Sequence, residues 1–165
     1  MQNPPLQVEI ILAGCPTVLA VGQEAPEFSG TIADGSRLTL SSLRGRPVVL
    51  YFYPKANTTG CTLEARGFTE HYPEFQRAGV AIVGVSVDST EAQKNFADKC
   101  SIPFPLVADR DKAIARQYGV LGLLGVAKRV TFFLDAEGRV TDVVEGMMPG
   151  PHVQRALAKL AAPPR

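Results

Sequence analysis

The fold of this 165-residue chain is decided by one continuous stretch, residues 47–68, which reads PVVLYFYPKANTTGCTLEARGF. Residues 47–53 are apolar without interruption and rich in β-branched and aromatic side chains, which is typical of a strand buried on both faces. Residues 79–88, GVAIVGVSVD, have the same character, and we expect a helix between the two strands. The order strand, helix, strand predicts a parallel, right-handed crossover and therefore an α/β fold.

The alternation of strands and helices continues on both sides of this unit. Upstream, Asp34-Gly35 is typical of a tight hairpin turn, and a short helical turn is expected between it and residue 45. Pro73 should interrupt the first helix. Further helices are expected over 89–100, with Ser89 or Thr90 as the cap, and over 110–119 and 151–160. Further strands are expected over 104–109 and, as a pair joined by a hairpin turn, within 129–146.

Together these elements predict a domain over residues 21–165 with a central mixed sheet, flanking helices and an N-terminal β-hairpin. Residues 1–20 form a separate N-terminal arm in this prediction. Its tetrapeptide LAGC, which ends at Cys15, resembles a lipoprotein cleavage site. The preceding residues contain no Lys or Arg and include Glu9, whereas an export signal starts with basic residues. The arm is therefore expected to be an extra strand or a loose segment.

Composition excludes several classes of function. The net charge is +1, with 45% hydrophobic and 20% charged residues, which indicates an ordinary globular protein. Without a basic stripe, no nucleic acid partner is expected, and no apolar run reaches the roughly 20 residues that span a bilayer. Three cysteines indicate free thiols in a reducing compartment, hence the cytoplasm. The sequence contains only two histidines, His71 and His152, so a histidine-rich metal site is not expected.

Cys61 follows a Thr-Thr-Gly turn and is expected in the first turn of the helix after residue 53. Helix N-termini and nearby cations lower a thiol pKa and so favour the reactive thiolate. The hydroxyls of Thr58 and Thr59 could cap this helix, and Gly60 would allow a close backbone turn. The free amides of the first turn could also stabilise charge on a reacting oxygen. From this local chemistry alone, a reactive thiol and an inert buried one are equally favoured.

A resemblance to the peroxiredoxins favours the reactive thiol. Pro54, Thr58 and Cys61 match the family pattern Pro-x-x-x-Thr-x-x-Cys, and the wider sequence is similar to the bacterioferritin-comigratory protein, or PrxQ, branch. The likeness runs from VGQEAPEF (21–28) through FPLVAD (104–109) and RVTFFLD (129–135) to the last helix. It implies a thioredoxin-like fold and a thiol-dependent peroxidase that needs no metal, haem or flavin.

The resemblance also implies roles for individual residues. Cys61 would be the peroxidatic cysteine, which attacks the peroxide and becomes a sulfenic acid. Thr58 would hydrogen-bond the peroxide and Pro54 would shield the thiolate from water. Arg129 matches the distant arginine that stabilises the thiolate and holds the peroxide oxygens.

Other residues near these motifs have two interpretations. Thr131 and Glu64 fall on positions of supporting groups, although Glu64 could equally be a solvated helix acid. Without the family, Arg129 itself would be interpreted as a solvated charge at a strand start. Tyr53, at the end of the first buried strand, is expected to pack rather than to react.

The sequence offers more than one candidate for the partner of Cys61. Many relatives carry a second cysteine five residues after the first, where this chain has Arg66. Others resolve from the helix after the next strand, which here contains Cys100, three residues beyond the position used in relatives. We therefore expect a Cys61–Cys100 disulfide, formed with local unwinding because the Cα atoms must approach within roughly 7 Å. A one-cysteine cycle with an external thiol and resolution by Cys15 stay open as alternatives.

The predicted function is thus the reduction of hydrogen peroxide and organic hydroperoxides, with recycling by thioredoxin or a similar thiol reductant, by a protein that is monomeric by resemblance. A peroxide sensor without turnover is the alternative. A thioredoxin-like disulfide reductase would need Cys-x-x-Cys, and Glu64 stands where the second thiol would be. The apolar segment 119–129 would favour alkyl hydroperoxides if it borders the pocket, although core packing is the commoner fate of such residues.

Overall fold

The structure, a computed structural model, describes residues 17–161. Its strands are β1 (Ser29–Ile32), β2 (Arg37–Thr39), β3 (Val48–Phe52), β4 (Ala81–Ser86), β5 (Leu106–Ala108), β6 (Val130–Leu134) and β7 (Val140–Glu145). Its helices are the 3-10 turn η1 (Leu40–Leu43), α1 (Thr59–Glu70), α2 (Tyr72–Arg77), α3 (Thr90–Cys100), α4 (Ala113–Gln117) and α5 (Pro149–Ala161). The predicted α/β architecture is confirmed.

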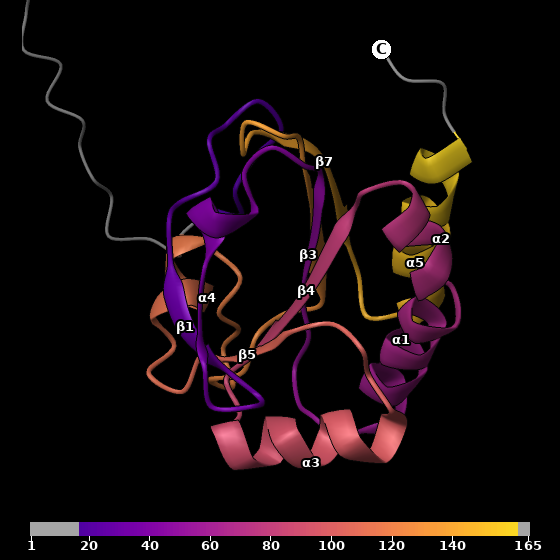
Figure 1. Cartoon of the computed structure of the whole chain (residues 1–165). Helices are drawn as coiled ribbons and strands as arrows, with labels where there is room; N and C mark the ends of the chain where they lie inside the picture. Colours follow the sequence, from indigo (N-terminus) through magenta and orange to yellow (C-terminus); the bar gives the residue numbers. More distant parts are fainter. Residues whose placement is uncertain (1–16, 162–165) are drawn as a thin grey trace, which may run out of the picture.

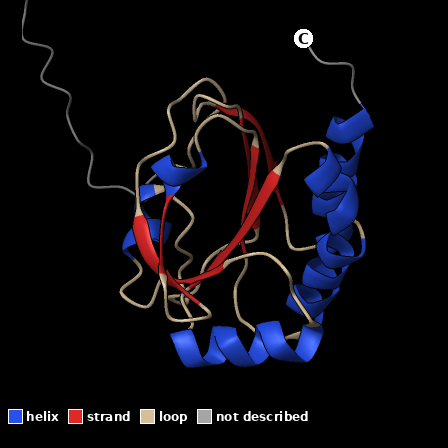
Figure 2. Cartoon of the chain, viewed as in Figure 1, coloured by secondary structure: helices blue, strands red, loops and turns tan. Residues whose placement is uncertain are grey.

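All seven strands form one mixed sheet in the order β2-β1-β5-β4-β3-β6-β7 (Figure 2). β3 lies inside the sheet, pairing parallel with β4 and antiparallel with β6. Every residue of β3 is buried, as expected for a strand covered on both faces. The parallel β3–α1/α2–β4 connection is the crossover that the sequence predicts.

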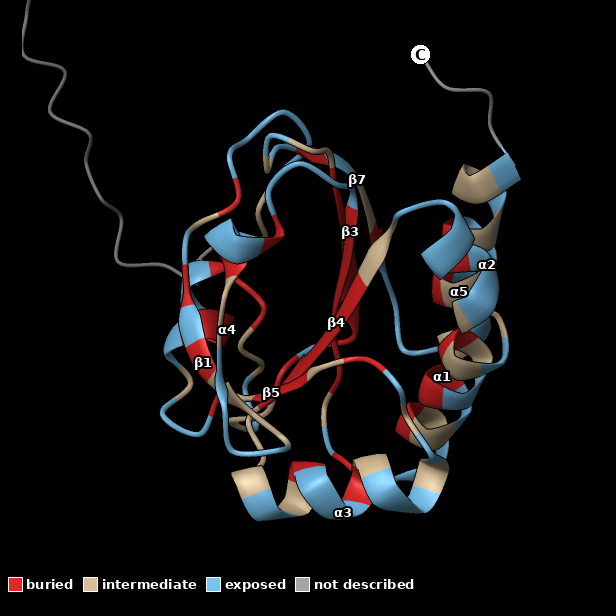
Figure 3. Ribbon diagram, viewed as in Figure 1, coloured by how far each residue is buried: buried red, intermediate tan, exposed pale blue. Residues whose placement is uncertain are grey.

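Helices cover both faces of this sheet. α1, α2 and α5 lie together on one side, α4 lies on the other, and α3 crosses one end (Figure 1). Successive β3 side chains alternate between two cores, because side chains along a strand point to opposite faces. Leu50 and Phe52 pack with the α4 residues Ile114 and Ala115. Tyr51 belongs to a second core, which contains residues of α1, α2, α3 and α5 and is hereafter called the helix-side core. The buried strands and half-exposed helices are visible in Figure 3.

Several local predictions from sequence are confirmed. β1 and β2 form the expected hairpin, and Gly35 in its turn has φ +88°, a conformation that favours glycine. The Ser89 hydroxyl caps α3 by accepting a hydrogen bond from the Ala92 amide at 3.1 Å. The chain breaks between α1 and α2 at His71, and Pro73 lies in the first turn of α2. Proline is tolerated there because the first amides of a helix need no intrahelical partner.

The apolar segment after Gly119 is only partly packed in a core. Val120 and Ala127 are buried, but in the core on the α4 side, across the sheet from the core that contains Cys61. Leu123 and Leu124 are 99% and 92% exposed at the tip of a short hairpin. The expectation of core packing is therefore wrong for these two leucines. The expectation that the segment favours alkyl hydroperoxides stays a prediction.

The predicted N-terminal arm is described only from residue 17 onward. Its last part lies against the end of α4, where the Leu19 amide donates to the Tyr118 carbonyl at 3.2 Å. Residues 17–20 form no strand. Cys15, the alternative resolving cysteine, lies outside the described residues.

Within residues 17–161, none of the helices combines the length and apolar character needed to cross a membrane. The same residues contain no cluster of three or more His, Cys, Asp or Glu side chains that could hold a metal ion.

Candidate active site

The site begins where β3 leads into α1. Cys61 is in the first turn of α1, as predicted, and only 1% exposed. A Cβ atom added to Gly60 would lie 3.0 Å from Nη2 of Arg129. Glycine at this position therefore lets the guanidinium approach the helix start closely.

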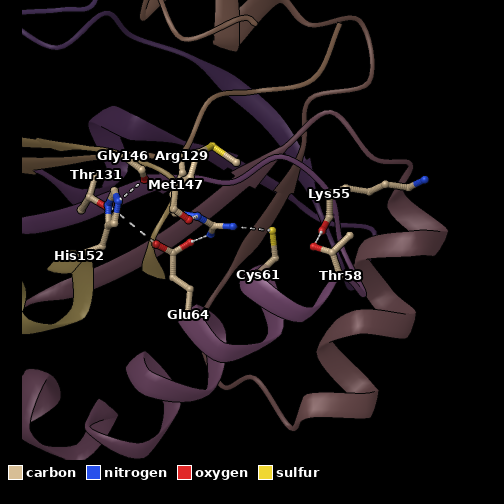
Figure 4. A network of polar contacts seen from close by, with 9 residues as sticks. All are labelled: Lys55, Thr58, Cys61, Glu64, Arg129, Thr131, Gly146, Met147 and His152. Atoms are coloured by element: carbon tan, nitrogen blue, oxygen red, sulfur yellow. Dashed lines mark hydrogen bonds and ion pairs between the residues drawn. The ribbon is translucent and has the colours of Figure 1, made fainter. Parts of the chain in front are cut away.

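Thr58 is the N-cap residue of α1, but its hydroxyl makes no capping bond to the helix. The hydroxyl instead donates to the Lys55 carbonyl at 2.8 Å (Figure 4). The expectation that this hydroxyl caps the helix is wrong, because its hydrogen bond goes to the Lys55 carbonyl instead. The hydroxyl hydrogen of Thr58 is used in the bond to the Lys55 carbonyl. The free lone pairs of Oγ1 can therefore accept a hydrogen bond from a peroxide O–H.

The loop between Pro54 and Thr58 is anchored by the side chain of Asp88, a residue that the sequence analysis did not identify. Oδ2 of Asp88, just after β4, accepts from the Ala56 amide at 2.8 Å and from the Ser86 hydroxyl at 2.6 Å. Carboxylates that accept backbone amides are strong anchors. Pro54 is half-buried in this anchored loop. Tyr53, just before it, is fully buried and packs in the helix-side core, as predicted.

Arg129, one residue before β6, is brought to Cys61 from a distant part of the sequence. It is 4% exposed, so the alternative of a solvated charge is wrong. Its guanidinium donates from Nη2 to Cys61 Sγ at 3.4 Å, from Nη1 to Glu64 Oε1 at 2.6 Å and from Nε to the Met147 carbonyl at 2.9 Å (Figure 4). The three contacts fix the planar group in position and orientation beside the sulfur.

Glu64 lies one turn after Cys61 on α1 and is fully buried. The alternative of a solvated helix acid is therefore wrong. Burial raises the pKa of this carboxyl to about 7, although the Arg129 charge and hydrogen bond act in the opposite direction. Burial alone would lower the pKa of Arg129, but Glu64 and Cys61 raise it overall. Glu64 thus orients the guanidinium as a carboxyl that titrates close to neutral pH.

Thr131 and His152 complete the buried polar group and contact each other at 2.8 Å, Oγ1 to Nδ1. Both are fully buried, Thr131 on β6 and His152 on α5. The sequence prediction included Thr131 but missed His152. Its signal was weak: a histidine on the apolar face of an amphipathic helix is more often a core residue than a functional one.

Cys100 is the last residue of α3 and half-buried. It packs against the helix-side core, to which Cys61 belongs. Both thiols are free, and the helices that carry them are intact. The predicted disulfide is therefore not formed in this conformation.

Cys61, Glu64 and Arg129 together form a site for nucleophilic chemistry. A sulfur at a helix N-terminus and beside a fixed cation lies where the free amides and the guanidinium can stabilise negative charge during a reaction. The guanidinium can also hold an oxygen on which negative charge develops.

Comparison with known proteins agrees with this geometry. The AhpC/TSA family matches residues 21–143. Peroxiredoxin Bcp of Escherichia coli K12 is 36% identical over 141 residues, which cover 81% of this chain and 90% of the relative.

Two solved structures are similar in both sequence and fold. Peroxidoxin BcpB of Mycobacterium tuberculosis is 36% identical with a TM-score of 0.82, over 88% of this chain and 98% of that one. The bacterioferritin comigratory protein of Xanthomonas campestris, studied for its alkyl peroxide reduction activity, is 35% identical with a TM-score of 0.76, over 81% and 90% of the two chains. The chain therefore belongs to the AhpC/TSA family, in its Bcp/PrxQ branch, and is a peroxiredoxin peroxidase with a thioredoxin-like fold.

Proposed function

We propose that this peroxiredoxin reduces hydrogen peroxide and alkyl hydroperoxides with Cys61 as the peroxidatic cysteine, Cys100 as the resolving cysteine and thioredoxin as the reductant. The observation that carries the proposal is the 3.4 Å hydrogen bond from Arg129 Nη2 to the buried sulfur of Cys61. A cation held at this distance can stabilise the negative charge on the sulfur and on the oxygens during the attack. The reported activity of the Xanthomonas relative on alkyl peroxides supports the same substrate class.

In the first step the Cys61 thiolate attacks one peroxide oxygen. A sulfur–oxygen bond forms while the O–O bond breaks, and the leaving oxygen takes a proton to become water or an alcohol. Cys61 is oxidised to a sulfenic acid and the peroxide is reduced. Arg129 stabilises the charge that moves to the oxygens, Thr58 orients the peroxide through its free lone pairs, and Pro54 limits the access of water.

In the second step the Cys100 thiol attacks the sulfenic sulfur, which forms the disulfide and releases water. Both cysteines border the helix-side core, so a local opening of the α1 and α3 ends would expose the thiols to one another. We expect this opening because a disulfide needs its two Cα atoms within roughly 7 Å. Thioredoxin then returns both thiols by exchange and is itself oxidised to its disulfide.

The resolving step is tested by peptide mapping of the full-length chain. After one equivalent of cumene hydroperoxide, wild type is expected to yield a Cys61–Cys100 peptide pair, because Cys100 is the thiol that borders the same core. Cys100→Ser should instead accumulate sulfenate or sulfinate on Cys61. Cys15→Ser, the matched control, should form the same crosslink as wild type.

Other outcomes of this mapping would select the alternatives. A crosslink that is lost only in Cys15→Ser would make Cys15 the resolving residue. Sulfenate without any crosslink in wild type would indicate a one-cysteine cycle. Oxidation without turnover in the presence of thioredoxin, thioredoxin reductase and NADPH would indicate a peroxide sensor.

The raised pKa of Glu64, about 7, predicts a pH dependence of the first step. As pH falls through about 7, the carboxylate gains a proton and its charge-assisted bond to Arg129 Nη1 weakens. Glu64→Gln resembles the protonated form at every pH. The ratio of wild-type to variant rate constants is therefore expected to rise about fourfold from about pH 6 to about pH 8, which is most of the about fivefold that a hydrogen bond contribution near 1 kcal/mol gives over the whole titration.

Stopped-flow measurement of Cys61 oxidation at each pH gives this ratio, in which the titrations of groups remote from Glu64 cancel. Glu70→Gln, on the exposed side of the same helix, is the matched control and should give a flat ratio. A flat ratio for Glu64→Gln as well would show that Glu64 ionisation does not influence the reaction.

The proposed cycle implies a cellular setting. A thiol peroxidase that thioredoxin recycles needs a compartment in which glutathione and thioredoxin keep cysteines reduced. We propose a cytoplasmic monomer, since the cycle described here is completed within one chain.

A further inference from the structure

His152 is a fully buried polar residue for which the proposed cycle has no role. It lies on α5 and projects toward the start of β6 and the end of β7 (Figure 4). Nε2 lies 2.8 Å from the Gly146 carbonyl, and Nδ1 lies 2.8 Å from Thr131 Oγ1. Both ring nitrogens are therefore satisfied, as buried polar groups require.

These contacts determine the protonation of the ring. A carbonyl oxygen only accepts, so Nε2 carries a hydrogen and donates it to Gly146. Burial lowers the pKa of His152 and Arg129 lowers it further, although the bond to Gly146 raises it. In the resulting neutral ring, Nδ1 accepts from the Thr131 hydroxyl. Without a hydrogen on Nδ1, the ring does not compete with Arg129 for Glu64, whose Oε2 is 3.9 Å away.

Both partners of His152 flank Arg129. Gly146 donates its amide to the Arg129 carbonyl at 3.3 Å. The next residue, Met147, accepts the guanidinium Nε through its carbonyl at 2.9 Å. Thr131 follows Arg129 by two residues on β6. The imidazole thus links the strand that carries the arginine to the turn that holds its guanidinium.

We propose that His152 is a positioning residue for the peroxidatic reaction, which fixes the Gly146–Met147 peptide and thereby aims the Arg129 guanidinium at Cys61. The proposal rests on the proposed function of Cys61 and Arg129. It assigns the histidine no contact with peroxide. A misplacement of a reacting group by about 1 Å can cost about 100-fold in rate, so a residue that only aims another can have a large effect.

Two substitutions separate the two ring nitrogens. His152→Gln retains an N–H near the position of Nε2 and so keeps the bond to Gly146. His152→Asn reaches only the position of Nδ1 and loses the bond to Gly146. Stopped-flow rates with cumene hydroperoxide are expected to fall about 10-fold to 100-fold in the Asn variant and to stay within about threefold of wild type in the Gln variant.

Two further measurements separate positioning from a purely structural role. In an Arg129→Lys background the Nε contact no longer exists, so adding His152→Asn should cost less than about twofold. The Nε–H resonance of Arg129, identified by its absence in Arg129→Lys, should shift in His152→Asn and persist in His152→Gln. His71→Asn and His71→Gln, at the other histidine, are matched controls and should react as wild type does.

The inference is overturned if His152→Asn reacts as fast as wild type, if the Asn and Gln variants are equally slow, or if the cost of His152→Asn is undiminished in the Arg129→Lys background. Should His152→Asn fail to fold, His152→Met removes both hydrogen bonds with a flexible apolar filler and is expected to show the same loss of rate. Failure of the proposed function is recognised separately, because wild-type Cys61 would then not be oxidised rapidly by peroxide at all.

Discussion

Serine in place of Cys61 is expected to lower the rate constant for peroxide reduction by at least about 10⁴-fold, the order of loss when an enzyme nucleophile is removed. The hydroxyl is not ionised near neutral pH, and no other described thiol has a guanidinium within hydrogen-bonding distance. The substitution is nearly isosteric and the side chain is buried, so the fold should persist. The variant isolates the chemistry of the sulfur from the packing of the helix.

The measurement is the consumption of cumene hydroperoxide and of hydrogen peroxide with thioredoxin, thioredoxin reductase and NADPH. Cys15→Ser serves as a control for the loss of a thiol elsewhere, and circular dichroism verifies the fold. Peroxide consumption by Cys61→Ser at the wild-type rate would contradict the assignment of the peroxidatic residue.

The second large effect is expected at Arg129, where lysine should lower the rate constant by about 10² to 10³-fold, the range for removal of one donor to a developing negative charge. Lysine keeps the charge but lacks the planar guanidinium, whose three nitrogens donate to Cys61, Glu64 and Met147 at the same time. Charge alone is therefore not expected to be sufficient. Arg129→Met, which lacks the charge as well, should be slower still.

Removal of the guanidinium also removes the partner that lowers the pKa of the buried Glu64 carboxyl, so this group is expected to take up a proton near neutral pH and to lose its hydrogen bond to Nη1. Some loss of stability is therefore expected beside the loss of rate. Arg129→Met/Glu64→Gln restores a neutral pair and separates this loss of stability from the loss of rate. Arg155→Lys, at an exposed arginine paired with Asp142, is the matched control. A rate for Arg129→Lys within about threefold of wild type would show that the planar guanidinium is dispensable.

The sequence was sufficient for the parts of the fold that local chemistry determines. The apolar run of β3, the Asp34-Gly35 turn and the Ser89 cap each depend on neighbouring residues. Such signals predict the type and place of an element well.

The sequence was insufficient where contacts join distant segments. The position of the Arg129 guanidinium depends on the Met147 carbonyl, and the role inferred for His152 depends on Gly146 and Thr131. Neither environment leaves a periodic pattern near the residue itself. Family resemblance identified Arg129, Thr131 and Glu64 as candidates, but only the structure decided whether the two charged residues were solvated or buried.

The hairpin that displays Leu123 and Leu124 is closed at its base by the bridge between Leu121 and Ala127 and by the Lys128 amide bonded to the Val120 carbonyl at 2.7 Å. Extra residues at its tip would therefore be insulated from β6, and each doubling of a loop costs only about 0.6 kcal/mol. An epitope or a fluorescent reporter can therefore be inserted at this tip without a change in the relative positions of Cys61 and Arg129.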